Sequence, residues 1–127
     1  ILNFLNSILT AVKKINFNNK VKIYCYIKRK PNFGRNLSHL NNIKRLQKKY
    51  DFFKILDPQS DIENYYNLFK TTISFPNTSQ SIYFSKTTNK ESIYYDIENS
   101  LVNKYDKKVS LISNELSLQK KIKKIFS

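Results

Sequence analysis

Few residues in this sequence could carry out covalent or metal chemistry, and those few are far apart. The soft metal ligands are Cys25 and His39, which stand 14 positions apart, whereas zinc requires three or four clustered ligands. A catalytic serine paired with His39 would need a sharp, glycine-flanked turn, and no serine here has that setting. The only glycine is Gly34, which excludes a glycine-rich phosphate-binding loop.

Acidic residues offer one other route to metal chemistry. Two groups are spaced closely enough to share an ion: Asp57, Asp61 and Glu63, and Asp96 and Glu98. Carboxylates beside turns and helix ends are more typical of surface charges. We therefore predict that the chain is not an enzyme and has no metal, no cofactor and no small-molecule substrate.

The chemistry that the sequence does offer is electrostatic. The 127 residues contain 23 Lys and Arg against 9 Asp and Glu, a formal charge of +14. Residues 1–50 hold 12 basic residues and no acid, residues 51–106 have a net charge of −3, and residues 107–127 have +5. A folded segment without carboxylates attracts a polyanion. Hydrophobic residues make up 40% of the chain, too many for a disordered basic tail. A folded nucleic-acid-binding protein is predicted.

One basic loop would contact a phosphate backbone directly. It contains Lys28, Arg29, Lys30 and Arg35, around the turn-forming Pro31 and Gly34. Successive cations repel one another inside a fold, and phosphates would stabilise them at a surface. Tyr24 and Tyr26 stand beside this loop, and they would either stack on bases or simply cover the outer face of a strand.

Hydrophobic periodicity predicts the elements that position these residues. Apolar residues at three- and four-residue spacing predict helices over 1–15 and 37–50, the second with a basic outer face. Period-two alternation over 21–27 predicts a half-buried strand. Short apolar runs predict further strands over 52–56 and 65–73.

The second half also mixes helices and strands. Thr88 and Glu91 have the spacing of a helix-capping box. The predicted elements are a strand at 82–84, a helix that begins near Thr88 and runs through 93–101, a strand at 109–112 and a basic terminal helix over 118–126.

We therefore predict an α+β protein of two small α/β lobes. Residues 1–73 would form an N-terminal α-β-α-β-β lobe, and residues 74–127 a C-terminal β-α-β lobe followed by a basic helix. The boundary would lie near residues 71–76. No apolar run approaches the roughly 18 residues of a membrane span. Cys25 is the only cysteine, which predicts a reducing compartment.

The order of these elements and four short segments resemble the small-subunit ribosomal protein S-eight family. The similar segments are Ile8–Lys14 in the first helix, Ile43–Phe53 at the second helix and strand, Ile73–Pro76 with Ile82-Tyr83 at the hinge, and Val109–Ser113 at the signature loop. The hinge is the best match. The signature loop departs most, because Asn114, Glu115 and Leu116 replace its usual Thr-Ser-Lys.

This resemblance implies a structural protein of an organellar small ribosomal subunit. The expected compartment is the mitochondrion, with another organelle as the alternative. Its partners would be small-subunit ribosomal RNA, in the central domain, and neighbouring ribosomal proteins. The RNA contacts that the resemblance implies are Thr10, Lys13 and Lys14 on the first helix, Ser74 and Pro76 at the hinge, and Ser113 and Asn114 on the signature loop. Lysines would supply salt-dependent attraction, and the hydroxyl and amide groups would bind 2′-hydroxyls and base edges.

Three other classes of protein share parts of this pattern. A small DNA-binding or transcription-control domain would place the helix over 38–50 in a major groove. A membrane-surface protein would use the wide apolar face of the helix over 1–15. A scaffold subunit would cover its basic surface with acidic protein partners.

Overall fold

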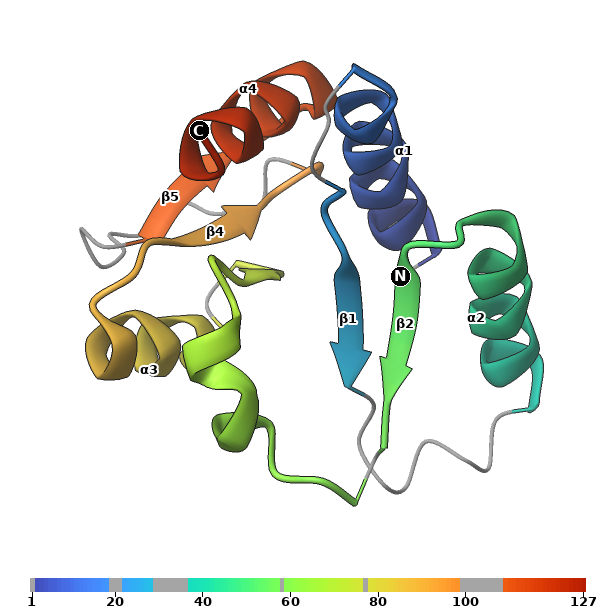
Figure 1. Cartoon of the computed structure of the whole chain (residues 1–127), viewed down its shortest axis with the longest axis horizontal. Helices are drawn as coiled ribbons and strands as arrows, with labels where there is room; N and C mark the ends of the chain where they lie inside the picture. Colours follow the sequence, from blue (N-terminus) through green and yellow to red (C-terminus); the bar gives the residue numbers. More distant parts are fainter. Residues whose placement is uncertain (1, 19–21, 29–36, 58, 77, 99–108) are drawn as a thin grey trace. The chain divides into compact units, whose positions relative to one another are not determined.

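The structure is a computed structural model that describes residues 2–18, 22–28, 37–57, 59–76, 78–98 and 109–127 (Figure 1). Contacts along the chain divide it into two compact units, which we call unit 1 (Ile1–Ile62) and unit 2 (Glu63–Ser127). The described residues form five helices and two small parallel sheets. The predicted α+β class with two small α/β lobes is confirmed. The boundary predicted between the two lobes lies after residue 73, whereas the contacts divide the chain after residue 62.

Unit 1 is built around a pair of parallel strands joined through a helix. Its elements are α1 (Leu2–Asn18), β1 (Cys25–Lys28), α2 (Leu37–Lys49) and β2 (Phe53–Leu56). β1 and β2 pair in parallel from Cys25↔Phe53 to Lys28↔Leu56. Parallel neighbours need a crossover connection, and α2 supplies it. The helices predicted over 1–15 and 37–50 and the strand predicted over 52–56 are confirmed. The first strand begins four residues later than predicted, at Cys25, and ends one residue later, at Lys28.

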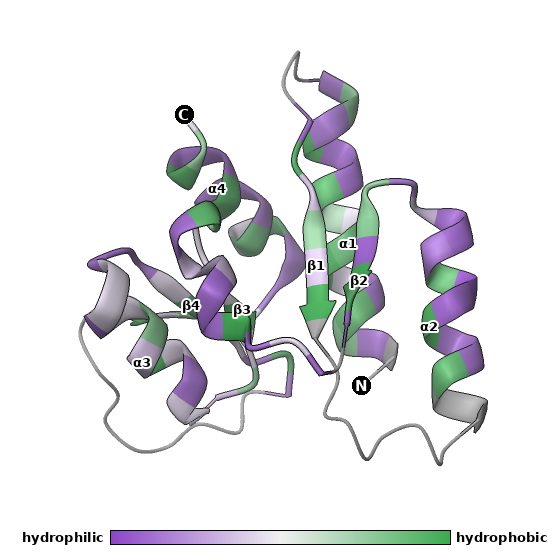
Figure 2. Cartoon of the chain, turned by 60° about the horizontal axis from the view of Figure 1, so that its bottom comes forward, coloured by the Kyte–Doolittle hydropathy of each residue, from purple (hydrophilic) through white to green (hydrophobic). Residues whose placement is uncertain are grey.

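The apolar stripe of α1 forms much of the unit 1 core. Its side chains at Leu9, Ala11, Val12 and Ile15 are at most 1% exposed. In Figure 2, apolar residues (green) and polar residues (purple) recur in turn along α1 and α2, as in amphipathic helices. The membrane-surface alternative required this apolar face of α1, and the core of the protein already buries it. In the described part of the chain no helix is long and apolar enough to cross a membrane.

A side chain joins the end of α1 to the start of β1. The amide of Asn16 donates to the backbone oxygen of Ile23 at 3.0 Å and accepts from its backbone nitrogen at 2.8 Å. Asn16 thus pairs with Ile23 as a neighbouring strand would, and Ile23 is 5% exposed. The backbone groups of Ile23 would otherwise need water or another partner.

Unit 2 contains a three-stranded parallel sheet flanked by helices (Figure 1). Its elements are the 3₁₀ helix η2 (Ile62–Leu68, whose first residue belongs to unit 1), β3 (Ile73–Ser74), α3 (Ser79–Thr88), β4 (Ser92–Tyr95), β5 (Val109–Ile112) and α4 (Glu115–Ile125). The strand order is β3-β4-β5, with Ser74↔Tyr94 and Tyr95↔Ile112 as register pairs. All four residues of β4 are buried, as the central strand of a parallel sheet requires.

The helix predicted from Thr88 onward is wrong, because Thr88 ends a helix instead of starting one. Its hydroxyl donates to the backbone oxygen of Phe84 at 2.7 Å. Asn89 follows in the left-handed conformation, with φ 58°, a common helix terminator. The apolar residues after Glu91 are the buried central strand β4, whose continuous burial removes any alternation that would have identified it.

Two predicted strands are also wrong. Residues 82–84 lie inside α3, whose buried face contains Ser81, Phe84 and Ser85. Two of these three residues are serines, so the helical period is invisible to a count of apolar residues. The strand predicted over 65–73 is replaced by η2 and by β3, which is only two residues long. The strand at 109–112 and the basic terminal helix are confirmed.

Replacing Asn16 by alanine should lower the free energy of unfolding by about 1–2 kcal/mol, because both backbone groups of Ile23 lose their partner. Asn18→Ala is the matched control, since Asn18 lies in the same turn and its amide only reaches the backbone oxygen of Lys14 at 3.4 Å. Urea denaturation of the 127-residue chain would measure both. Equal midpoints for the two variants would contradict this role for Asn16.

Candidate functional site

Loops that follow the three strands of unit 2 meet at one edge of its sheet, which we call the carboxyl edge. The strands are parallel neighbours, so their carboxyl ends lie side by side. Phe75, Pro76 and Thr78 lie between β3 and α3, Asp96 follows β4, and Ser113 and Asn114 lead from β5 into α4. Ligands of open parallel α/β sheets bind at this edge. It is the candidate functional site.

The loop after β3 presents the N-terminus of α3 at the carboxyl edge. Thr78 is the N-cap residue, in an extended conformation, and its side chain makes no cap hydrogen bond. Its hydroxyl donates instead to the backbone oxygen of Phe75 at 2.7 Å. The first turn of α3 contains no acidic residue. The positive end of the helix dipole therefore meets no negative side chain of its own first turn.

A tyrosine from the central strand holds this loop in place. The hydroxyl of Tyr94 donates to the backbone oxygen of Thr78 at 3.2 Å, and Tyr94 is 1% exposed. The amide of Gln80 donates to the hydroxyl of Tyr66. Both the N-cap and the first turn of α3 are thus attached to buried aromatic residues.

The N-terminus of α4 differs from that of α3. Asn114 accepts a hydrogen bond from the backbone nitrogen of Ser117 at 2.9 Å, which is a regular N-cap. Glu115 adds a carboxylate in the first turn. Because α4 already carries a cap and a negative charge, an anion at the carboxyl edge would be attracted to α3.

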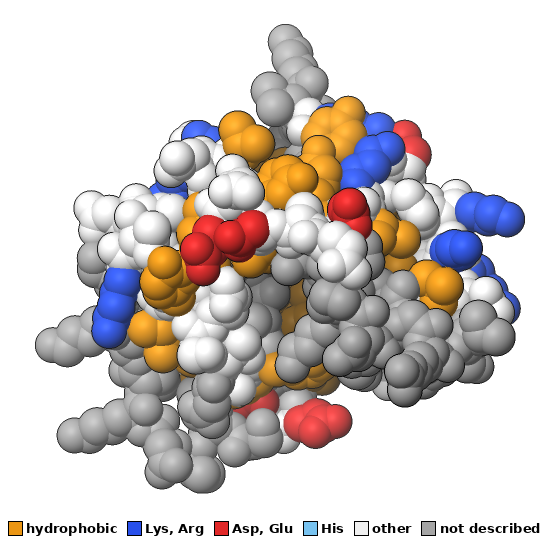
Figure 3. Space-filling model, turned by 90° about the horizontal axis from the view of Figure 1, so that it is seen from below, with side chains coloured by type: hydrophobic (Ala, Val, Ile, Leu, Met, Phe, Trp, Pro, Cys, Tyr) orange, Lys and Arg blue, Asp and Glu red, His pale blue; other side chains and the backbone are white. Residues whose placement is uncertain are grey.

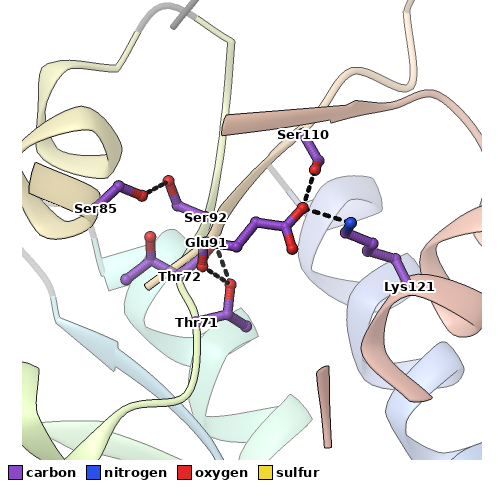
Figure 4. A network of polar contacts seen from close by, with 7 residues as sticks. All are labelled: Thr71, Thr72, Ser85, Glu91, Ser92, Ser110 and Lys121. Carbon is purple, nitrogen blue, oxygen red and sulfur yellow. Dashed lines mark hydrogen bonds and ion pairs between the residues drawn. The ribbon is translucent and has the colours of Figure 1, made fainter. Parts of the chain in front are cut away.

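Serine hydroxyls fill the contact between α3 and the sheet. Ser81, Ser85 and Ser92 form this serine cluster, and each is at most 1% exposed. Ser92 donates to the backbone oxygen of Ser81 at 3.0 Å, and its hydroxyl lies 2.6 Å from that of Ser85. Figure 4 shows the Ser85–Ser92 contact. The Ser81 hydroxyl contacts those of Ser74 and Thr72, so all three buried hydroxyls have partners, as their burial requires.

A second polar group lies at the opposite, amino-terminal edge of the sheet (Figure 4). The Glu91 carboxylate accepts from the hydroxyl of Ser110 on β5 and pairs with Lys121 on α4. The hydroxyl of Thr71 donates to the backbone oxygen of Glu91 at 2.8 Å. Burial opposes ionisation of Glu91, but Lys121 and Ser110 outweigh it and lower the pKa of the carboxyl below its usual value. These contacts connect β3, β4, β5 and α4.

Lys90, the neighbour of Glu91, serves a different segment. Its ammonium donates to the backbone oxygens of Phe69 at 2.7 Å and Asn67 at 3.2 Å, and lies 3.5 Å from that of Tyr66. A cation at the carbonyl end of η2 satisfies acceptors that the helix leaves open. In the described residues, no three His, Cys, Asp or Glu side chains gather as a metal site would require.

The predicted RNA-contacting residues, both those implied by the ribosomal resemblance and those of the basic loop, fall into separate places. In unit 1, Thr10 bonds within α1 at 2.7 Å to the backbone oxygen of Asn6. Lys13 lies 5.9 Å from the ring centre of Tyr50. Lys14 is exposed, and Lys28 ends β1. Arg29, Lys30 and Arg35 lie outside the described residues.

The predicted residues of unit 2 converge on the carboxyl edge. Ser74 contacts the hydroxyl of Ser81 and thus faces α3. Pro76 is half-buried in the loop before α3, Ser113 is exposed, and Asn114 caps α4. Figure 3 shows basic side chains interspersed with acidic and apolar ones, and the described residues on that face form no continuous basic surface.

The comparison with protein families decides between these interpretations. The family model described as "Polysaccharide biosynthesis PFTS motif protein" matches residues 1–122. The chain belongs to this PFTS motif family. No curated protein and no solved structure matches it.

Membership of the PFTS motif family shows that the ribosomal assignment is wrong, together with the predicted function in translation. The resemblance depended on short segments, each an apolar strand or helix beside a polar turn, and such segments recur in many α/β proteins. Its best match, Ile73–Pro76, consists of β3 and the first two residues that follow it at the carboxyl edge. The signal that the sequence did contain was Thr78-Ser79, two residues after Pro76, which is typical of a helix start.

Glu91→Gln should make unit 2 less stable at neutral pH and flatten its pH dependence in acid. The folded-state pKa of Glu91 is lowered, so its stabilisation is complete above the unfolded value of about 4.3 and is lost as pH falls through the folded value. Because the Glu91 side chain is 37% exposed, we expect a loss of about 1 kcal/mol or less at pH 7.

Urea midpoints at pH 7, 5 and 3 would measure this effect. Glu98→Gln is the control, because it removes the same charge from an exposed position after β4. A difference between Glu91→Gln and the parent chain that is as large at pH 3 as at pH 7 would show that Glu91 does not stabilise the fold through its charge.

Proposed function

We propose that this chain acts in polysaccharide biosynthesis and that its carboxyl edge binds a phosphate-bearing sugar precursor. The observation that carries the proposal is the family model, which extends over residues 1–122. Sugars are activated for polymerisation as phosphate esters, most often of nucleotides, so a protein of this process has an anionic ligand to recognise. The proposal concerns binding. The absence of enzymatic activity and the mitochondrial compartment stay predictions from the sequence.

The geometry of the α3 N-terminus supports phosphate binding. Backbone N–H groups in the first turn of a helix point along the axis toward a ligand, and the helix dipole favours negative charge there. The hydroxyl of Thr78 is engaged with Phe75, and the first turn of α3 has no carboxylate to compete with a phosphate. Tyr94 fixes the backbone of Thr78, so the donors would be positioned before the ligand arrives.

Apolar side chains at the same edge would accommodate the remainder of the precursor. Phe75 is 45% exposed after β3, Ile97 is 44% exposed after β4, and Leu116 is 62% exposed in the first turn of α4. Binding sites for small molecules combine such apolar surfaces with a few fixed polar groups. A sugar or base ring would lie against this surface while its phosphates meet α3.

Ser79→Glu tests the site without removing any contact of the fold. A carboxylate in the first turn interacts favourably with the helix dipole, so the variant should fold, while it repels phosphate. Calorimetric titration of the 127-residue chain with UDP-glucose, GDP-mannose and inorganic pyrophosphate should show at least about tenfold weaker binding for Ser79→Glu, the loss of roughly 1.4 kcal/mol.

Thr87→Glu is the matched control for Ser79→Glu. It introduces the same charge on an exposed position in the last turn of α3, so binding should change less than threefold. Equal weakening of binding by both variants would show that the effect comes from the added charge alone and not from its position at the N-terminus of α3. No binding of any of the three probes by the parent chain at millimolar concentration would refute the proposed site.

A further inference from the structure

The sheet of unit 1 exposes two tyrosines that the proposed site in unit 2 does not use. Tyr24 and Tyr26 are 50% and 49% exposed, although β1 is paired with β2 along its whole length. Residues two apart on an extended chain point to the same side of a sheet. The rings of Tyr24 and Tyr26 thus lie on the same face of the sheet, two residues apart along the chain. Half-exposed neighbouring aromatic rings on a rigid sheet are unusual in a surface that only meets water.

Charged side chains flank the two rings. Lys22 lies with its ammonium 5.6 Å from the ring centre of Tyr24, and it pairs with Asp51 at 2.6 Å. On the other side, Lys54 of β2 is the register partner of Tyr26 and is exposed. We call Lys22, Tyr24, Tyr26, Asp51 and Lys54 the tyrosine face.

We infer that the tyrosine face binds a polysaccharide chain, with successive sugar rings stacked on Tyr24 and Tyr26. A pyranose ring has an apolar face of C–H groups and a rim of hydroxyls. An aromatic ring covers the apolar face, and charged groups beside it exchange hydrogen bonds with the rim. This inference rests on the proposed function, because the family places the chain among proteins that handle sugar polymers.

The choice of a sugar chain over a nucleic acid rests on the family, because the charges on the tyrosine face are mixed. Tyrosines beside lysines also stack bases, and the two ammonium groups of Lys22 and Lys54 outnumber the one carboxylate of Asp51. Asp51 has 80% of its side chain exposed, and a hydrogen bond from Lys22 together with the charge of Lys54 lowers the pKa of its carboxyl. An ionised carboxylate accepts hydrogen bonds from sugar hydroxyls and has no proton to donate to a phosphate oxygen.

The local structure holds the face rigid. The backbone nitrogen of Cys25 donates to Phe52 at 3.0 Å, which continues the pairing of β1 and β2 beyond the register pairs. Phe52, just before β2, and Phe53, its first residue, are buried, at 3% and 2% exposure. A ligand would therefore meet rings whose backbone is already ordered, and association would lose little conformational entropy there.

Affinity electrophoresis and calorimetry of the 127-residue chain with hexasaccharides test this inference. The probes are β-1,4-linked glucose, α-1,4-linked glucose and β-1,4-linked N-acetylglucosamine, with single-stranded poly(U) as the competing class. We expect at least one hexasaccharide to bind with a Kd in the millimolar range or below. Binding should weaken at least about tenfold in Tyr24→Thr with Tyr26→Thr, because threonine keeps the strand propensity and removes the ring.

Tyr83→Gln is the matched control, since Tyr83 is a tyrosine of similar exposure, 47%, on α3. It should leave hexasaccharide binding unchanged. Because the hexasaccharides carry no phosphate, failure of the nucleotide-sugar titrations would refute only the carboxyl edge. No hexasaccharide binding, equal loss in Tyr83→Gln, or a tyrosine-dependent preference for poly(U) would overturn the tyrosine face as a polysaccharide site.

Discussion

The parallel pairing of β4 with β3 on one side and β5 on the other governs the arrangement of unit 2. β4 is hydrogen-bonded to a strand on each side, and all its residues are buried. Because the three strands run in the same direction, the chain leaves each of them at the carboxyl edge and returns along a helix or loop. This constraint alone brings the loop before α3, the segment after β4 and the cap of α4 together. Their side chains could differ widely without changing that meeting point.

The serine cluster decides how α3 lies on this sheet. Apolar side chains would allow small rotations of the helix, because dispersion contacts have little directionality. Hydrogen bonds from Ser92 to the backbone of Ser81, together with the Ser85 contact, require one rotation and one height. The small volume of serine also lets the helix approach closely. The orientation of the α3 N-terminus toward the carboxyl edge therefore depends on a polar interior.

Much of the fold followed from local pattern, and the exceptions have physical causes. The helices α1, α2 and α4 carry strong apolar stripes, and β2 and β5 are short apolar runs bounded by turns, so their type was predictable. The helix α3 was not predictable, because its buried serines resemble residues of a solvent-facing surface. The strand β4 was not predictable either, because the continuous apolar run of a central strand also fits a helix. For the same reason, Thr88 was predicted to begin a helix, whereas it ends α3.

The candidate site was predictable in position more than in chemistry. Ser74, Pro76, Ser113 and Asn114 were chosen through a resemblance to another family, and the structure places all four at the carboxyl edge. Polar residues just after apolar strands gather there in any parallel sheet, so such a resemblance selects residues at this edge whatever the function of the protein. Tyr94 was hidden, since only the three-dimensional fold brings its hydroxyl to Thr78.

The neighbouring pair Lys90 and Glu91 has a consequence for how the sheet avoids misalignment. Consecutive residues at the start of a strand point in opposite directions, and here the ammonium reaches three carbonyl oxygens while the carboxylate reaches a hydroxyl and another ammonium. A shift of the strand by one residue would exchange them, placing a carboxylate against carbonyls and one ammonium against another. The two opposite charges therefore favour the native strand register, because the shifted register is electrostatically unfavourable at both positions.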